Sequence, residues 1–454
     1  MSFKTPQTIM ERKYYIETYG CSLNISDTEY MEGRLAEAGY ENCQDINLAN
    51  VIIINTCTVK DRTFLEFRKR IEYFREFKKE KDREGKLLAV VVAGCIPQAN
   101  PENPILQPFA LIGPDCIEDI ADIVDAAITG ETPKHLKTDK KDSRLNRFHI
   151  RKNPVIEILP ISRGCLGSCS FCQTRFARGS LVSYPMEEII TQAKTSLEDG
   201  VREIWLTSQD AGAWGMDAGS SLPSLLENLL KISGDYRVRL GMANPDHIIS
   251  YLEPLLDIFT DERMFRFIHL PLQSGSDDIL NKMNRLYTIT QYLGICERIY
   301  GRYPDFSIST DVIAGFPGET EEDFEKTLEA LKKIKPAVVN RSKFSARPKT
   351  PASRMPQLPS RIISQRSQRL ARLVEELSLE NNRQWIGRSC RVLIDDRKKA
   401  GSVVSRNNHY KPVVIPLIPG NREVNDCLVP GRFLQVRIEE ALTYHLTGKP
   451  EITG

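Results

Sequence analysis

The sequence has no long apolar run. No stretch approaches the roughly 18 apolar residues that cross a membrane, and the N-terminal segment lacks the apolar core of a signal peptide. The chain also lacks an excess of charge of either sign, because its 62 Lys and Arg are almost balanced by 60 Asp and Glu. Any surface that binds a polyanion must therefore be local. The six histidines are scattered and form no arrangement with Ser and Asp that activates a nucleophile. We therefore expect a cytoplasmic protein without a membrane partner and without side-chain acid–base catalysis.

Cysteine, in contrast, is plentiful. The chain has 11 cysteines and no export signal, which indicates a reducing compartment in which clustered thiols are ligands rather than disulfides. Five of them show no ligand spacing, and we expect these to be structural thiols: Cys43, Cys116, Cys296, Cys390 and Cys427.

Three cysteines form the run C-x₃-C-x₂-C in "RGCLGSCSFCQTRFARG", at Cys165, Cys169 and Cys172. They follow a strand-like segment directly, which predicts a loop at the carboxyl end of a parallel strand, where barrel enzymes carry out chemistry. No fourth cysteine lies nearby. Three thiolates suit a cubane iron–sulfur cluster with one iron open to another ligand. The alternative is a zinc knuckle completed by a distant Cys or His.

Three further cysteines each end an apolar run, at Cys21 ("KYYIETYGC"), Cys57 ("ANVIIINTC") and Cys95 ("LLAVVVAGC"). Segments with helical apolar spacing separate the runs, which predicts a β-α-β-α-β layout and a parallel sheet. Because the carboxyl ends of parallel strands share one edge, we expect these three thiols to converge. Singly, each is equally a small buried hydrophobic residue.

The fold class predicted for the whole chain is α/β with a small β-domain at the end. Residues 1–133 form the parallel sheet domain, and the charged segment 134–152 is a linker. Residues 153–384 contain six strand-like runs alternating with helices, which indicates a partial (βα)₆ barrel. Residues 385–449 have short β-rich runs broken by turns, which indicates a small antiparallel barrel.

Both cysteine patterns together resemble one family, the radical S-adenosylmethionine (SAM) methylthiotransferases, whose three domains occur in this order and end in a TRAM domain. "GCLGSCSFCQTRFARG", "LTSQDAGAWG", "HLPLQSGSDDIL" and "SRNNHYKPVVI" look like the archaeal and eukaryotic branch. That branch acts on N6-threonylcarbamoyladenosine at position 37 of tRNA. Members that act on isopentenyl-adenosine tRNA or a ribosomal protein usually have Asn where this chain has Leu166.

The resemblance implies two 4Fe-4S clusters, one on each cysteine trio, and SAM as both radical source and methyl donor. A 5′-deoxyadenosyl radical would remove hydrogen from C2 of the adenine, and the N-terminal cluster would deliver a methylated sulfur, with no catalytic side chain beyond the cluster ligands. By the same resemblance, Ser208, Gln209 and Asp210 contact the amino end of SAM, Gln273 and Ser274 its ribose, and Phe171 lies beside the cluster. Arg178 either orients SAM or substrate or forms a structural ion pair.

The expected partners are the anticodon loop of tRNA, a reductant protein such as ferredoxin or flavodoxin, and an unknown sulfur donor. From Gly387 to Lys449 the chain has 11 Lys and Arg against 6 Asp and Glu, and this excess predicts phosphate contacts. The candidates are Arg388, Arg391, Lys398, Lys399, Arg406 and Lys411, with Tyr410 for stacking. The basic helix with Arg361, Arg366, Arg369 and Arg372 either extends that surface or is a solvated face. Alternatives are another methylthiotransferase substrate, or a non-catalytic iron–sulfur RNA-binding protein.

Overall fold

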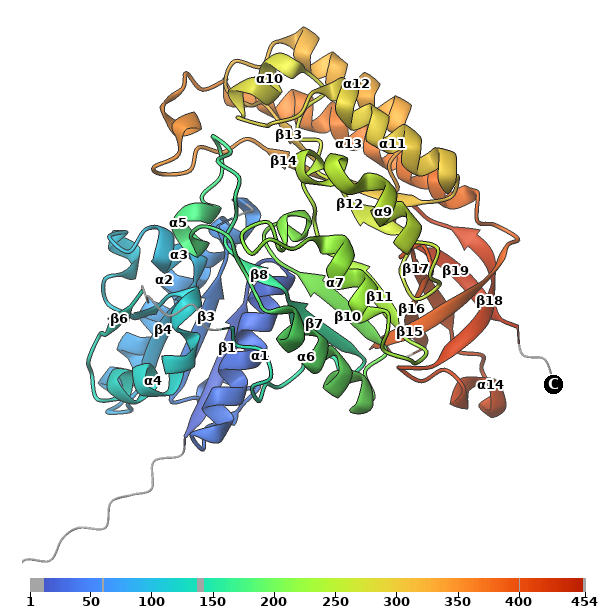
Figure 1. Cartoon of the computed structure of the whole chain (residues 1–454). Helices are drawn as coiled ribbons and strands as arrows, with labels where there is room; N and C mark the ends of the chain where they lie inside the picture. Colours follow the sequence, from blue (N-terminus) through green and yellow to red (C-terminus); the bar gives the residue numbers. More distant parts are fainter. Residues whose placement is uncertain (1–11, 59–60, 137–142, 400, 452–454) are drawn as a thin grey trace, which may run out of the picture. The chain divides into compact units, whose positions relative to one another are not determined.

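The computed structural model describes residues 12–58, 61–136, 143–399 and 401–451 (Figure 1). The chain divides into two compact units. The first comprises residues 1–152 together with the short segment Phe176–Arg178, and the second comprises the remaining residues. Each unit is described by itself.

The first unit is built on a six-stranded sheet with the order β2-β1-β3-β4-β5-β6, in which every neighbouring pair is parallel. This confirms the predicted parallel α/β domain. The strands are β1 (Lys13–Thr18), β2 (Glu41–Asn42), β3 (Val51–Thr56), β4 (Ala89–Gly94), β5 (Ala110–Ile112) and β6 (Lys134–His135). Since β6 pairs with β5, the start of the predicted linker is the edge of this sheet.

Helices cover both faces of the first sheet because its central strands are apolar on both faces. Val51 and Ile53 of β3 face a core with Tyr30, Met31 and Leu35, whereas Ile52 and Ile54 face a core with Phe67 and Phe74. The alternation follows the two-residue period of a strand. The helices are α1 (Ser22–Glu37), α2 (Asp61–Arg83), α3 (Cys95–Ala99) and α4 (Ile120–Ile128).

The second unit begins with six parallel strands in two sets. Their orders are β11-β10-β7 and β12-β13-β14, and single parallel bridges join Val238 to Met264 and Met242 to His269. The six strands therefore lie side by side in chain order, as in the predicted partial (βα)₆ barrel. They are β7 (Ile156–Pro160), β10 (Glu203–Thr207), β11 (Arg237–Leu240), β12 (Phe267–His269), β13 (Ser307–Ala314) and β14 (Val338–Lys343), and the short β8 (Ser162–Arg163) pairs with β9 (Val182–Ser183).

The helices between these strands start at recognisable capping sequences. Thr288 with Gln291, and Thr320 with Asp323, form reciprocal capping boxes at the starts of α11 and α12. The helices are α5 (Thr174–Arg178), α6 (Met186–Glu198), α7 (Leu222–Leu229), α8 (Pro245–Ile248), α9 (Leu252–Ile258), α10 (Asp277–Lys282), α11 (Ile289–Arg302), α12 (Glu321–Ile334) and α13 (Ser360–Arg383).

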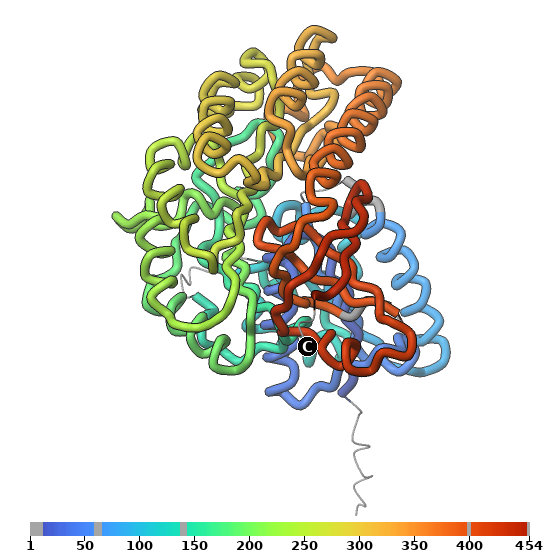
Figure 2. The backbone as a smooth tube through the Cα atoms, turned by 90° about the vertical axis from the view of Figure 1, so that its right-hand side faces the viewer, coloured from blue at the N-terminus to red at the C-terminus, as the bar shows by residue number. Residues whose placement is uncertain are grey.

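Helix α13 leads into a closed five-stranded barrel with the order β15-β16-β17-β19-β18, which confirms the predicted C-terminal barrel (Figure 2). Its core contains Trp385, Val392, Val403, Ile415 and Ile438. The elements are β15 (Ser389–Lys399), β16 (Ser402–Asn407), β17 (Pro412–Pro416), α14 (Arg422–Asp426), β18 (Phe433–Ala441) and β19 (Leu446–Pro450). Among the described residues of the whole chain, no helix is both long enough and apolar enough to span a bilayer.

Candidate functional site

The three N-terminal cysteines lie at the carboxyl ends of neighbouring strands. Cys21 is the N-cap of α1 just after β1, Cys57 follows β3 directly, and Cys95 follows β4 as the first residue of α3. These strands are adjacent in the order β1-β3-β4, so the structure brings the three residues to one stretch of the sheet edge. The space beside Gly20 where a side chain would begin is filled by Cys57, whose Cβ lies 2.4 Å from that point.

The three thiols interact with one another. A hydrogen bond from the Cys57 thiol, and after it the charge of Arg178, lower the pKa of Cys21 to about 6. Burial raises the pKa of Cys95, and the charge of Cys21 acts on it in the same direction. Both effects require the sulfur atoms to be close together, which is the arrangement that a shared iron–sulfur cluster needs.

A buried polar network that the sequence analysis missed holds these strand ends together. Asn24 donates from Nδ2 to the carbonyl of Thr56 (2.8 Å) and to Asn55 Oδ1 (3.3 Å), and Asn55 donates back to the carbonyl of Asn24 (2.8 Å). Thr56 Oγ1 donates to the carbonyl of Ala93 (2.6 Å) and accepts from the backbone N–H of Ile96 (3.2 Å). The polar pair "NT" at the end of the buried run "VIIINT" was the available signal.

The second cysteine trio lies on the loop between β8 and α5 in the second unit. The backbone N–H of Gly167 donates to Cys165 Sγ (3.2 Å), and the backbone N–H of Thr174 donates to Cys172 Sγ (3.4 Å). Burial raises the pKa of Cys165 to about 12 and raises that of Cys172 as well. Because metal ligands must be thiolates, binding of a cluster here releases protons.

Arg285 lies against this trio and was also missed from the sequence. Its Nη1 donates to Cys169 Sγ (3.3 Å) and its Nη2 to Asn244 Oδ1 (2.5 Å). Burial works against the charge of this nearly enclosed guanidinium, but the neighbouring Tyr287 and Cys169 raise the pKa of Arg285 above its usual range. A permanent cation that donates to a ligand sulfur stabilises the thiolate form. Arg285 comes more than a hundred residues after Cys169, so local spacing gave no signal.

The residues predicted to contact SAM differ in their surroundings. Ser208 Oγ and Gln209 Oε1 are buried polar atoms without a hydrogen-bond partner among the described residues. Asp210 is fully buried, and its carboxylate accepts from the backbone N–H groups of Gly212 and Asn244 (3.1 Å each) and pairs with His247 Nδ1 (2.9 Å). Buried orphan acceptors are costly unless a ligand satisfies them, so the loop after β10 fits a polar group such as the amino end of SAM.

The other predicted SAM contacts lie after β12. Gln273 adopts a left-handed backbone (φ 66°) and exchanges backbone hydrogen bonds with β13, and Ser274 is fully buried with its Oγ 3.4 Å from Thr327 Oγ1. Phe171 packs edge-on against Phe316, with ring centroids 6.5 Å apart. Their contacts with a cofactor stay predictions.

Neither trio converges as the ligands of a single ion do, since no three His, Cys, Asp or Glu side chains among the described residues are placed to hold one metal ion. Each iron of a cubane takes its own thiolate, so cluster ligands lie farther apart than the ligands of one zinc ion. An iron–sulfur cluster with SAM therefore fits better than a zinc knuckle. Each site offers three thiolates, Arg285 donates to Cys169, and Ser208 and Gln209 have buried acceptors without a partner among the described residues.

Arg178 is placed in the first unit, where it is almost fully enclosed. Its Nη2 pairs with Asp27 Oδ2 (2.5 Å) and its Nε donates to Cys95 Sγ (3.4 Å). Of the two predicted roles for Arg178, the ion pair is the one observed. The prediction did not anticipate a partner beside the N-terminal thiols.

Part of the predicted RNA surface is wrong, because three of its residues are packed between the C-terminal barrel and the base of the partial barrel. Tyr410 packs against Phe265 and Phe267 (ring centroids 5.0 and 4.8 Å apart), and Arg406 lies over the Tyr410 ring and pairs with Asp395 (3.0 Å). Lys411 is buried and donates to Asn382 Oδ1 (2.9 Å), and burial lowers its pKa to about 8.

The other residues predicted to bind phosphate differ in their exposure and in their partners. Arg391 makes a forked ion pair with Asp235 (2.5 and 3.1 Å), whereas Arg388 is exposed. The side chains of Lys398 and Lys399 lie outside the part of the chain that the structure describes. Arg437 and Lys449, both exposed, lie directly opposite each other on β18 and β19. Like charges opposed across a strand pair destabilise a sheet, so this pair does not stabilise the barrel.

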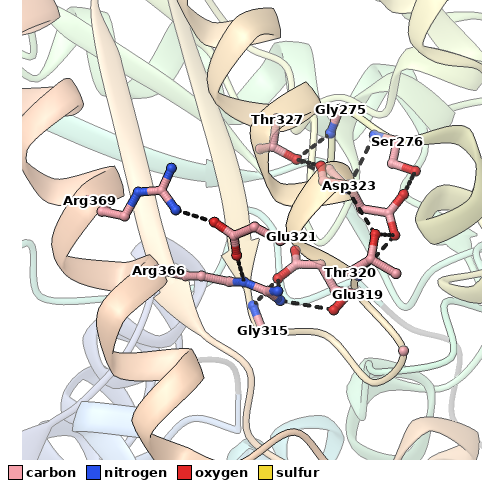
Figure 3. A network of polar contacts seen from close by, with 12 residues as sticks. Gly275, Ser276, Gly315, Glu319, Thr320, Glu321, Asp323, Thr327, Arg366 and Arg369 are labelled. Atoms are coloured by element: carbon pink, nitrogen blue, oxygen red, sulfur yellow. Dashed lines mark hydrogen bonds and ion pairs between the residues drawn. The ribbon is translucent and has the colours of Figure 1, made fainter.

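Two of the four arginines of the predicted basic helix form ion pairs with acidic residues. Arg366 is buried, and its Nη1 donates to the carboxylate of Glu319 (2.7 Å) and to the backbone carbonyl of Glu319 (2.9 Å) (Figure 3). The Glu319 carboxylate also accepts from the backbone N–H of Gly315 (2.8 Å). Arg369 pairs with Glu321 and Glu325. These contacts join α13 to α12 and to the loop that precedes α12. Arg366 is therefore neither part of an RNA surface nor solvated, whereas Arg369 is partly exposed and, like the exposed Arg361 and Arg372, agrees with a solvated face.

Three family models match the chain. They are an uncharacterized protein family, UPF0004, over residues 13–110, the radical SAM superfamily over residues 159–331, and the TRAM domain over residues 368–450. The first two ranges contain the N-terminal and the central cysteine trio, respectively.

Two named relatives match almost the whole chain. A probable threonylcarbamoyladenosine tRNA methylthiotransferase of Pyrococcus horikoshii is 36% identical over 439 residues, which cover 96% of this chain and 99% of the relative. The threonylcarbamoyladenosine tRNA methylthiotransferase of Homo sapiens is 36% identical over 448 residues, which cover 97% of this chain and 74% of the relative. Among solved structures, the radical S-adenosylmethionine methyltransferase TsrM from Kitasatospora setae has a TM-score of 0.55 at 13% identity, over 75% of each chain, which shows the likeness of fold.

Proposed function

Because this chain belongs to the radical SAM methylthiotransferases of the threonylcarbamoyladenosine type, we propose that it adds a methylthio group to C2 of N6-threonylcarbamoyladenosine at position 37 of tRNA. The observation that carries the proposal is the match to relatives of that name in an archaeon and an animal over nearly the whole length. The chain is a radical SAM enzyme that uses SAM and iron–sulfur chemistry, and the finer proposal is that it holds two 4Fe-4S clusters.

In this proposal, each cysteine trio holds one cluster. Cys165, Cys169 and Cys172 hold the cluster that binds SAM, with Arg285 donating to Cys169 and the orphan acceptors Ser208 and Gln209 directed to the amino end of SAM. With both cofactors bound, reductive cleavage of SAM supplies a 5′-deoxyadenosyl radical that removes hydrogen from an unactivated carbon. The protein contributes position and a water-poor site, which explains why no acid–base pair is needed.

Cys21, Cys57 and Cys95 hold the second cluster, the source of the transferred sulfur. The network of Asn24, Asn55 and Thr56 keeps the three strand ends at fixed spacing, and such supporting contacts are typical of metal sites. The proposal also needs an electron donor, such as a ferredoxin or flavodoxin, and a sulfur donor. We expect a cytoplasmic reaction because the tRNA substrate is found there.

The proposed tRNA contact uses the exposed basic residues of the C-terminal barrel. Arg388, Arg437 and Lys449 are the candidates for phosphates near the anticodon loop, in place of Arg406 and Lys411. Replacing Arg437 and Lys449 by Gln is expected to weaken tRNA binding and to lower the slope of log affinity against log salt by about 0.7–0.9 per lost contact. An unchanged slope in filter-binding measurements would place the RNA surface elsewhere.

The substrate is tested by mass analysis of nucleosides in tRNA from cells with and without the gene. Loss of the methylthio-threonylcarbamoyladenosine peak, restored by the natural gene but not by a Cys165→Ala gene, is the expected result. Loss of a methylthio-isopentenyl-adenosine peak, or of a ribosomal-protein modification, would support the other methylthiotransferase substrates instead. An unchanged profile, with no SAM cleavage by reconstituted and reduced protein, would favour a non-catalytic iron–sulfur RNA-binding protein.

A further inference from the structure

A buried arginine lies beside the N-terminal thiols although it belongs to the "FARG" segment that follows the other cysteine trio in sequence. Arg178 is 2% exposed, and two of its three guanidinium nitrogens have partners in the first unit. Nε donates to Cys95 Sγ, and Nη2 pairs with Asp27 Oδ2. Nη1 is buried and has no hydrogen-bond partner among the described residues. A buried N–H donor without an acceptor is costly, so this site is built for an acceptor that the polypeptide does not supply.

Arg178 shares its carboxylate partner with a second arginine. Its partner Asp27 is 1% exposed and also binds Arg144 through Oδ1, and Arg144 donates to the carbonyl of Pro114 (3.0 Å). Two buried guanidinium groups thus bind the same carboxylate, so Asp27 is not available to Arg178 alone. A buried charge is stabilised by a counter-charge close by, and neutral thiols do not provide one.

A cluster on the three neighbouring thiolates would place negative charge beside Arg178. A 4Fe-4S core of formal charge two plus, bound by three thiolates, is a monoanion overall, and one added electron makes it a dianion. Its sulfur atoms accept hydrogen bonds. Net charge and hydrogen bonds to sulfur are the properties by which a protein sets the reduction potential of such a cluster.

We propose that Arg178 is the counter-charge of the iron–sulfur cluster held by Cys21, Cys57 and Cys95, a positioning residue that favours its binding and raises its reduction potential. This proposal rests on the two-cluster function proposed above. Asp27 fixes the guanidinium in place, so that Nε is directed to Cys95 and Nη1 is left for a further acceptor of the bound cluster. The added electron is stabilised most, because the attraction to Arg178 grows with the negative charge of the cluster.

The test uses the full chain with Cys165, Cys169 and Cys172 replaced by Ala, so that only the N-terminal trio binds iron. Iron per chain and the midpoint potential, from EPR spectra at poised potentials, are measured for this parent and for its Arg178→Gln variant. We expect Arg178→Gln to lower the potential by an amount equivalent to a tenfold change in the reduction equilibrium, about 59 mV for one electron. Arg178→Lys, which keeps the charge but not the forked donors, is expected to give a smaller shift in the same direction.

Arg144→Gln is the matched control, because it removes the other guanidinium bound to Asp27 while the Arg178–Cys95 contact is kept. Its potential is expected to lie closer to that of the parent than the potential of Arg178→Gln. Equal potentials in the parent and Arg178→Gln, or equal shifts in Arg178→Gln and Arg144→Gln, would overturn the proposal and leave Arg178 a structural ion pair. If Arg178→Gln fails to fold by circular dichroism, Arg178→Met, which also removes the charge, is measured in its place, and an unshifted potential has the same meaning. A parent that binds no iron would instead refute the two-cluster function itself.

Discussion

Substituting Gly94 by Ala adds a single methyl group, and we expect this to move the thiols of Cys57 and Cys95 apart. Gly94 ends β4 and caps α3 immediately before Cys95, with φ 91° and ψ −145°. A Cβ at this position would lie 2.4 Å from Asn55 Oδ1 and 2.6 Å from the carbonyl oxygen of Thr56, the residue before Cys57. Both contacts are far shorter than van der Waals distance, so the ends of β3 and β4 must move apart in a Gly94→Ala variant.

The expected cost has two parts. The backbone conformation, which residues with a side chain rarely adopt, costs on the order of 1–3 kcal/mol. Displacing the end of β3 adds about 1–3 kcal/mol, as overpacking typically does. Gly130→Ala isolates the first part, because Gly130 has φ 94° in the same unit and a Cβ there would meet nothing within 4 Å. We therefore expect Gly94→Ala to be less stable than Gly130→Ala by about 1–3 kcal/mol.

The assay combines urea unfolding with iron analysis after anaerobic reconstitution. In a chain without the central cysteine trio, Gly94→Ala should lose most of its iron, since Cys57 and Cys95 no longer keep their spacing, whereas Gly130→Ala should keep it. If both variants were equally stable and equally loaded with iron, the view that the contact between β3 and β4 sets the thiol spacing would be refuted.

Three further changes test other parts of the molecule. Arg285→Gln removes the donor to Cys169 and should lower the yield of 5′-deoxyadenosine from SAM by about 10- to 100-fold, as loss of a supporting contact to a metal ligand commonly does; an unchanged yield would contradict this role. Burial raises the pKa of Glu203 from 4.5 to about 7, so the stability this group contributes is present below pH 4.5 and is lost as the pH rises through 7. Natural protein should therefore lose about 3 kcal/mol relative to Glu203→Gln between acidic and neutral pH, measured by urea unfolding, and parallel pH profiles would contradict it. Tyr410→Ala should cost about 3–5 kcal/mol of stability as an aromatic truncation, because the Tyr410 ring packs against Phe265 and Phe267; a loss of tRNA affinity without a loss of stability in this variant would restore the stacking interpretation.

Much of the fold and of the placement of the two cysteine trios was predictable because the relevant signals are local. An apolar run that ends in a cysteine marks the carboxyl end of a buried strand, and the parallel order of β1, β3 and β4 then brings Cys21, Cys57 and Cys95 together. The C-x₃-C-x₂-C run needs no tertiary information at all. The capping pair Thr320 and Asp323 was likewise visible in sequence and is present in the structure.

The supporting residues were not predictable in this way. Arg285 acts on Cys169 across more than a hundred residues, and Arg178 acts on Cys95 rather than on the trio next to it in sequence. Charge composition misled for Arg406 and Lys411, because a basic residue in a β-rich segment looks exposed until the surface packed against it is known. Tyr410 was predicted to stack on an RNA base, but its ring packs against Phe265 and Phe267.

The way the C-terminal barrel is attached has a consequence for engineering. Arg366 of α13 binds Glu319. Tyr410, at the turn between β16 and β17, packs against Phe265 and Phe267. The barrel is therefore held against the rest of its unit by side-chain contacts and is not joined to it by a flexible linker alone. A chimera that exchanges this barrel for a homologous one must therefore keep both Tyr410 and the two phenylalanines that it packs against. Cutting the chain after α13 would expose the apolar side chains of Phe265 and Phe267, and the shortened protein would be prone to aggregate.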